Sequence, residues 1–235
     1  MPSRVLSLLA ILAAGCGRRA APSTEPRYLA LGDSYTIGES VPPADRFPVQ
    51  LARRLRLGEP EIIARTGWTV DELNRGIDDA APRGTYPLVT LLIGVNDQYR
   101  GGTAEAYRPA FAALLRRAIG FAGGEAKGVV VVSIPDWGAT PFAEGRDRAA
   151  IGAAIDQFNA VNRDEALRVG AKYVDITPIS RRAREDRSLI AGDGLHPSGA
   201  MYGLWAEAIA RALTPGEREA ASGERAHQPG TGGGK

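Results

Sequence analysis

Cysteine and histidine are both scarce in this sequence. Cys16 is the only cysteine, so no intramolecular disulfide can form. The histidines are His196 and His227, and neither belongs to an HExxH motif. Because grouped histidines and paired cysteines are the usual ligands of catalytic zinc, the sequence gives little support to a metal hydrolase. We expect neither a metal nor an organic cofactor.

An excess of charge of one sign is also missing. The 235 residues carry 29 basic and 27 acidic side chains, a formal net charge of +2, and the two signs are interspersed. Nucleic-acid binding requires a basic patch or stripe, so we expect no nucleic-acid partner. The densest run of charge, from Arg181 to Arg187, contains both signs and is interpreted as a solvated helix or loop face.

Long apolar runs are absent, but a short one lies near the N-terminus. Residues 5–14 are apolar or small and follow Arg4, which is typical of an export signal and too short to span a bilayer. The run ends in Ala13-Ala14-Gly15-Cys16, which resembles the lipobox of bacterial lipoproteins, whose cysteine is lipidated. Ala13 stands where that pattern usually has leucine, so plain secretion and an uncleaved anchor remain alternatives. We expect an exported protein, held in the cell envelope through a lipid on Cys16, or otherwise periplasmic or secreted.

Composition divides the chain into four parts. After the signal at 1–16, residues 17–26 are small, charged and proline-containing, as in a flexible tether. Residues 27–213 are long enough to bury one α/β core. From Thr214 to residue 235 the chain is rich in proline, glycine, alanine and charge, and we predict a disordered tail.

Short β-branched or aliphatic runs alternate with longer amphipathic stretches in residues 27–213. The continuous run Val129–Val132 is typical of a parallel strand buried on both faces. Strands are predicted at 28–31, 61–64, 88–93, 129–133 and 173–175, and helices at 47–57, 70–79, 109–121, 146–169 and 198–213, with Pro109 opening the third helix. This alternation predicts a three-layer α/β/α sandwich around a mostly parallel five-stranded sheet.

Ser34 follows the first predicted strand directly, in Gly32-Asp33-Ser34-Tyr35. A serine hydroxyl is a weak nucleophile that needs a base, a group that orients the base, and donors for the oxyanion that forms. His196 is the candidate base, because His227 lies in the polar, glycine-rich tail. In Asp193-Gly194-Leu195-His196-Pro197, a tight turn at the glycine can return the Asp193 carboxylate to the imidazole Nδ1. Taken alone, the same stretch could equally cap the following helix.

Four motifs, in this order, resemble the blocks of the SGNH, or GDSL-type, hydrolases. They are Gly-Asp-Ser at 32–34, Gly67, Gly94-Val95-Asn96-Asp97, and Asp193-Gly194-Leu195-His196-Pro197. The resemblance covers the region from residue 27 to residue 213 and implies the flavodoxin-like fold of that family. It also implies that Ser34 is the nucleophile and His196 the base oriented by Asp193. The oxyanion hole is then formed by the backbone amides of Ser34 and Gly67 and by the side chain of Asn96.

These residue types suit such a site on chemical grounds. A glycine lets the backbone approach closely with an unshielded amide, and an asparagine amide donates without carrying charge. Without the resemblance, Gly67 could be an ordinary turn glycine, and Asp97 is expected to cap or brace its loop. All the motifs follow predicted strands, at the sheet edge where ligands bind in open α/β folds. The loop after the fourth strand opens on that edge, so we hypothesise that Trp137 and Phe142 line the acyl or alcohol pocket; alternatively, they cover the sheet.

The predicted function is hydrolysis of carboxylic esters by two-step acyl transfer, as in esterases and lysophospholipases. The expected substrate is a small-molecule, lipid or glycan ester. One alternative with the same residues is a carbohydrate O-deacetylase or acyltransferase at the cell surface; a more remote one is a non-catalytic lipoprotein that binds acylated ligands. The G-x-S-x-G elbow of α/β-hydrolases is absent, because Tyr35 and Thr36 follow Ser34.

Overall fold

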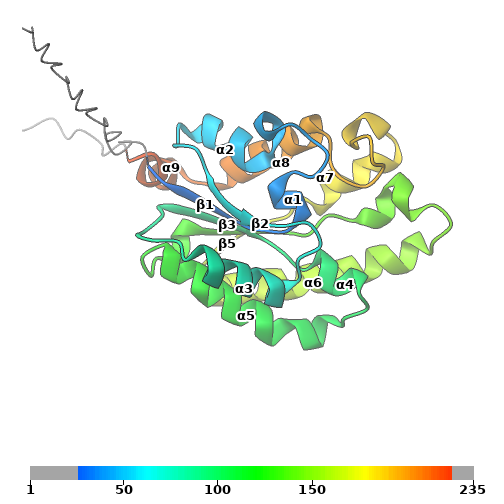
Figure 1. Cartoon of the computed structure of the whole chain (residues 1–235), viewed down its shortest axis with the longest axis horizontal. Helices are drawn as coiled ribbons and strands as arrows, with labels where there is room; N and C mark the ends of the chain where they lie inside the picture. The colour runs from blue at the N-terminus through cyan, green and yellow to red at the C-terminus, as the bar shows by residue number, and fades with distance from the viewer. Residues whose placement is uncertain (1–25, 224–235) are drawn as a thin grey trace, which may run out of the picture.

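The computed structural model describes residues 26–223 and builds them around one parallel sheet (Figure 1). Its strands are β1 (Tyr28–Gly32), β2 (Glu61–Ala64), β3 (Leu88–Leu92), β4 (Val129–Val132) and β5 (Lys172–Val174). They lie in the order β2-β1-β3-β4-β5, and each neighbouring pair is parallel. The predicted α/β fold with its five-stranded parallel sheet is confirmed. Parallel pairing brings all the carboxyl ends of the strands to one edge.

Helices cover both faces of this sheet (Figure 1). On one face lie α1 (Ser34–Ile37), α2 (Phe47–Leu55), α7 (Thr177–Arg181) and α8 (Gly199–Ala212), and on the other α3 (Val70–Ala80), α4 (Val95–Tyr99), α5 (Ala104–Phe121) and α6 (Arg148–Val169). The pair α2 and α8 pack together on the first face, and α5 and α6 on the second. Consequently β1, β3 and β4 are buried along their whole length, as the valine run of β4 predicts.

Helix α5 begins earlier than the sequence indicated, and the prediction that Pro109 opens it is wrong. The Thr103 hydroxyl caps the helix by accepting a hydrogen bond from the Ala106 amide at 3.2 Å, and Pro109 lies inside the helix. Proline has no amide hydrogen for the carbonyl four residues earlier, that of Glu105. Since Pro109 is on an exposed face, water can solvate that carbonyl, and the helix tolerates the proline.

The chain also continues in regular structure beyond the predicted end of the domain. Residues Pro215–Ser222 form helix α9, so the prediction of a disordered tail from Thr214 is wrong for this stretch. A capping box explains it: the Thr214 hydroxyl accepts from the Glu217 amide, and the Glu217 carboxylate accepts from the Thr214 amide. Ala221 is buried against the core, so α9 belongs to the folded body.

The predicted export signal, Cys16 and the tether up to residue 25 lie outside the described residues, as does the chain after residue 223. Within residues 26–223, no helix is both long and apolar enough to cross a membrane.

Candidate active site

Ser34 occupies the junction between β1 and α1. The Asp33 carboxyl group caps this one-turn helix by accepting from the Tyr35 amide at 3.0 Å, and Ser34 is the first residue of the helix. The turn is tight: a Cβ on Gly32 would come within 2.1 Å of the Thr36 hydroxyl and 2.4 Å of the Leu92 carbonyl oxygen. Only glycine fits there, and the abrupt change from strand to helix leaves Ser34 at the sheet edge with 5% of its surface exposed.

A short loop brings Asp193 and His196 to the same edge. Its two ends are joined by an isolated antiparallel bridge between Ile190 and Pro197. Within the loop, Oδ1 of Asp193 accepts from the amides of Leu195 and His196, each at 2.9 Å. The Oδ2 atom lies 2.6 Å from Nδ1 of His196 and accepts from the Ser40 hydroxyl at 2.7 Å. The predicted return of the Asp193 carboxylate onto the imidazole is therefore present in the structure.

The electrostatics of Asp193 fix the tautomer of His196. Partial burial alone would raise the pKa of Asp193, but the hydrogen bonds from Ser40, from the His196 ring and from two backbone amides lower it well below the ordinary value. The carboxylate is therefore ionised at neutral pH and accepts the Nδ1 hydrogen, which leaves Nε2 of the neutral ring as the proton acceptor. The ring itself is 7% exposed and lies against Tyr35, with ring centroids 5.3 Å apart.

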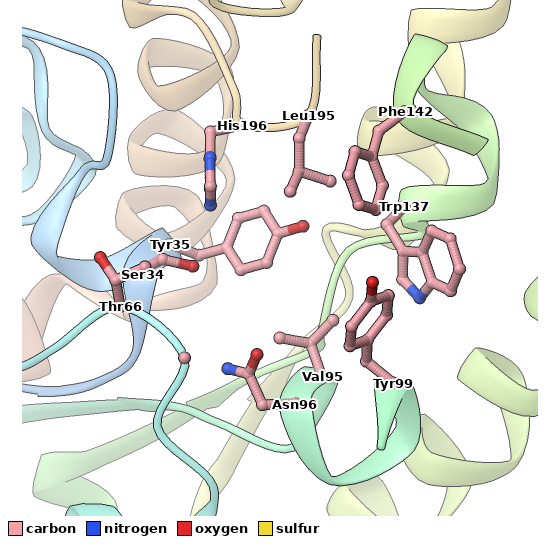
Figure 2. A pocket seen from close by; sticks show the side chains of 11 residues that line it. Ser34, Tyr35, Thr66, Val95, Asn96, Tyr99, Trp137, Phe142, Leu195 and His196 are labelled. Atoms are coloured by element: carbon pink, nitrogen blue, oxygen red, sulfur yellow. The ribbon is translucent and has the colours of Figure 1, made fainter. Parts of the chain in front are cut away.

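Ser34 and His196 face each other across one cavity of about 160 Å³. Figure 2 shows the imidazole directed toward Ser34 from one wall, with Asn96 below. Within the described part of the chain, no hydrogen bond joins the two side chains, which is common in catalytic pairs before substrate binds. The cavity is lined by Ser34, Tyr35, Thr66, Gly67, Val95, Asn96, Tyr99, Trp137, Phe142, Leu195 and His196.

Three hydrogen-bond donors meet beside Ser34. The backbone amides of Ser34 and Gly67 donate to no acceptor in residues 26–223. Gly67 has a φ of +83°, a conformation that favours glycine. Nδ2 of Asn96 donates to the Trp68 carbonyl oxygen at 2.9 Å, which fixes the orientation of the side-chain amide. Its only other acceptor in residues 26–223 is Oδ2 of Asp33, at the longer distance of 3.4 Å. This arrangement can supply a set of oriented donors to an anion at Ser34.

Two carboxyl groups lie near these donors, Asp33 fully buried and Asp97 half-buried. Asp33 is 0% exposed, and burial raises its pKa to about 8, an effect that the Tyr35 amide opposes and the nearby Asp97 increases. Burial also raises the pKa of Asp97 to about 6, and a hydrogen bond from the Val70 amide partly opposes this rise. That bond, at 3.2 Å, ties the short helix α4, which follows β3, to the start of α3. Asp33 is therefore largely protonated at neutral pH.

An aromatic wall closes the cavity opposite Ser34 (Figure 2), and we use this name for Tyr99, Trp137 and Phe142. Trp137 and Phe142, the residues hypothesised to line the acyl or alcohol pocket, both border this cavity. Trp137 donates from Nε1 to the Gln98 side chain at 2.8 Å, and Tyr99 meets its ring edge-on at 5.3 Å. Tyr99 escaped the sequence analysis, although it lies one helical turn after Asn96 and so shares a side of α4 with it.

The loop that carries Trp137 and Phe142 is anchored by Asp136. This carboxylate is fully buried, accepts from Nε of Arg181 at 2.9 Å and lies 3.3 Å from Nη2 of Arg184. The interpretation of the charged run 181–187 as a solvated face therefore fails for Arg181, which is half-buried, but holds for Arg184, which is exposed although it also pairs with Asp136. The mixed charges of this run could not reveal the ion pair, because the acidic partner of Arg181 lies 45 residues away in the sequence.

Residues 26–223 contain no group of three or more histidine, cysteine or acidic side chains that could hold a metal ion. The donors around the cavity are instead amides, a hydroxyl and an imidazole, a set suited to acyl chemistry.

Comparison with known proteins agrees with this geometry. The profile of the GDSL-like lipase/acylhydrolase family matches residues 30–204. The chain belongs to this family. No curated protein sequence matches the chain. As a GDSL family member, the protein is an ester hydrolase, and the resemblance inferred from its four motifs is confirmed.

Solved structures of GDSL proteins share this fold. A G-D-S-L family protein from Veillonella parvula superposes with a TM-score of 0.63 at 17% identity, covering 80% of this chain and 98% of that one. A phospholipase A1 from Streptomyces albidoflavus gives a TM-score of 0.63 at 18% identity, with 80% and 99% covered. An acetylxylan esterase from Geobacillus stearothermophilus gives 0.60 at 20% identity, with 81% and 94% covered. At these identities the likeness establishes the fold alone.

Proposed function

We propose that Ser34, His196 and Asp193 hydrolyse carboxylic esters by two-step acyl transfer. The observation that carries the proposal is the His196 ring, held at Nδ1 by an ionised Asp193 and turned toward Ser34 across a cavity that also contains Asn96. A base with a fixed tautomer, a hydroxyl in front of it and aimed amide donors beside it are the components that acyl transfer needs.

In the first step, Nε2 of His196 takes the proton of the Ser34 hydroxyl as Oγ attacks the ester carbonyl carbon. The negative charge on the carbonyl oxygen is stabilised by the amides of Ser34 and Gly67 and by Nδ2 of Asn96. The bond to the alcohol then breaks, and the alcohol oxygen receives the proton from His196. In the second step, water gives its proton to Nε2 and attacks the acyl carbon; Ser34 regains that proton, and the acid leaves.

The cavity favours a small substrate group. With a volume of about 160 Å³, it accommodates a short acyl or alkyl group, and a longer chain would extend out of it. A carbohydrate O-deacetylase or acyltransferase is the second candidate. It is supported by this small cavity and by the exposed rings of Tyr99 and Phe142 at its rim, on which a sugar can stack.

Replacement of the nucleophile and the base tests the proposal. We expect Ser34→Ala and His196→Ala each to lower kcat for para-nitrophenyl butyrate by at least about 10³-fold, since each removes a component of one catalytic unit. Acetylated sugars assayed alongside separate the two candidate substrate classes.

Two controls accompany these variants. His227→Ala removes the other histidine and Ser188→Ala removes an exposed serine, and both are expected to keep full activity. Wild-type turnover in a folded Ser34→Ala protein would show that the site is misassigned.

We also propose that the protein is exported and that Cys16 carries a lipid that anchors it to the cell envelope. The support is the apolar run at 5–14 and the lipobox-like end at Cys16. Partition of the expressed full chain into a detergent phase, lost in Cys16→Ser, is the expected result; equal partition of both would refute the anchor.

A further inference from the structure

Arg146 lies over the aromatic wall of the cavity. Its guanidinium carbon is 5.3 Å from the ring centroid of Phe142, 5.5 Å from that of Trp137 and 5.9 Å from that of Tyr99. Since all three rings line the cavity and Arg146 does not, this cation lies next to the aromatic wall, outside the cavity. The Arg146 side chain makes no hydrogen bond within residues 26–223, so its N–H groups are available to a further partner.

The charge of Arg146 is not matched by an acidic partner in residues 26–223. Its nearest acidic residue in the sequence, Asp147, has another role: its Oδ1 accepts from the amides of Ala149 and Ala150, at 3.1 and 2.9 Å, and caps α6. Arg100, beside Gly67, differs in this respect. It lies 3.2 Å from the Glu72 carboxylate and donates to the Gly67 carbonyl at 2.7 Å, so its charge is compensated.

The surface around Arg146 is accessible and partly apolar. Arg146 is exposed, and 47% of Tyr99 and 40% of Phe142 are exposed beside it. A substrate longer than the cavity can continue outward past these rings, because both line the cavity and are exposed. A polar group on that part of a substrate would come close to the guanidinium of Arg146.

We propose that Arg146 binds an anionic group of the ester substrate, a carboxylate or a phosphate, in the part of the substrate that leaves the cavity past Tyr99 and Phe142. The planar fork of arginine suits both anions, which it binds through two parallel hydrogen bonds. The inference rests on the proposed esterase function and adds that the preferred esters are negatively charged.

Matched pairs of esters test this. On the acyl side, para-nitrophenyl hemisuccinate and hemisuberate are compared with the butyrate and octanoate. On the alcohol side, the butyrate of hydroxypropyl phosphate is compared with propyl butyrate. We expect Arg146→Gln to lower kcat/KM for at least one anionic ester by about fivefold, through KM, and to change its neutral partner by less than about twofold. Loss on the phosphate arm, the carboxylate arm or both identifies the anion.

Ionic strength and two further variants test whether the preference for anionic esters comes from the charge of Arg146. The wild-type preference for the anionic ester should shrink as ionic strength rises, whereas Arg146→Gln should show no such dependence. Arg148→Gln removes the same charge two residues along and should behave as wild type, and Arg146→Lys should retain part of the preference.

The outcomes separate this inference from the function on which it rests. Equal changes on every anionic and neutral pair in Arg146→Gln would mean that Arg146 only supports the aromatic wall, and would overturn the anion site alone. Absence of any Ser34-dependent hydrolysis, neutral esters included, would overturn the esterase function and the anion site together.

Discussion

At the scale of single residues, Asp33 shows how burial changes the pKa of a carboxyl group. Nothing in the neighbouring sequence indicates this change. Burial raises its pKa to about 8, whereas the same carboxyl in the unfolded chain titrates near 3.9. Between these values the folded protein keeps a proton that the unfolded chain releases. Raising the pH therefore favours unfolding, so the stability contributed by this group is complete below about pH 4 and is lost as pH rises to about 8.

Asp33→Asn should remove this pH dependence. Asparagine is an equally good helix cap, and it is neutral at every pH. We expect the free energy of unfolding of the variant, relative to wild type, to rise on the order of 2 kcal/mol between pH 6 and pH 8. Urea denaturation at a series of pH values measures it, with the exposed Asp79→Asn as control. A constant difference across this range would mean that Asp33 is ionised in the folded protein.

At the scale of elements, helix α5 contains a destabilising proline that a single substitution can remove. Pro109 interrupts the backbone hydrogen bonds inside the helix and is exposed, so its side chain contributes little packing. Pro109→Ala restores the amide and is expected to stabilise the protein by about 1–2 kcal/mol, less than the full proline penalty because alanine also frees the unfolded chain. The thermal midpoint should rise accordingly.

Pro215→Ala is the matched control, because Pro215 occupies the first position of α9, where proline has no hydrogen bond to lose. It should be neutral or slightly destabilising. A rise in the thermal midpoint as large as that of Pro109→Ala would show that chain entropy, and not the missing hydrogen bond, governs both sites.

At the scale of the whole molecule, α9 joins the two ends of the described chain, on the side away from the active site. A Cβ on Gly223 would lie 3.0 Å from Pro26, just before β1, and Lys172 pairs with Glu217 at 3.0 Å. Ser34, by contrast, lies at the carboxyl end of β1. We therefore expect the terminal helix to stabilise the fold and to have no effect on catalysis.

Truncation tests this separation. A chain that ends at Leu213 should be less stable than the full chain by about 1–2 kcal/mol, because it loses α9 and uncovers Leu213. A chain that ends at Gly223 should keep full stability. Both should retain the wild-type kcat/KM at a temperature where they are folded. Equal denaturation midpoints for all three chains would mean that α9 contributes nothing.

Elements with strong periodicity or buried runs could be predicted from the sequence, and short ones could not. The valine run of β4 and the long helix α6 lie close to their predicted positions. Helices α1 and α4, of 4 and 5 residues, are too short to show a periodic pattern. These short helices carry Ser34 and Asn96, so the sequence placed both residues after strands and missed the turns that orient them.

The sequence alone determined the family, the parallel sheet and the edge at which Ser34, Gly67, Asn96 and His196 meet, because strand direction fixes where each following loop opens. Only the tertiary structure decided what depends on contacts between distant segments. It turned Ser40 onto the Asp193 carboxylate, buried Asp33 beside Asn96, brought two arginines to Asp136 and placed Arg146 over the aromatic wall. Burial of polar groups and pairing of distant charges are properties of the packed molecule, and no local pattern of residues encodes them.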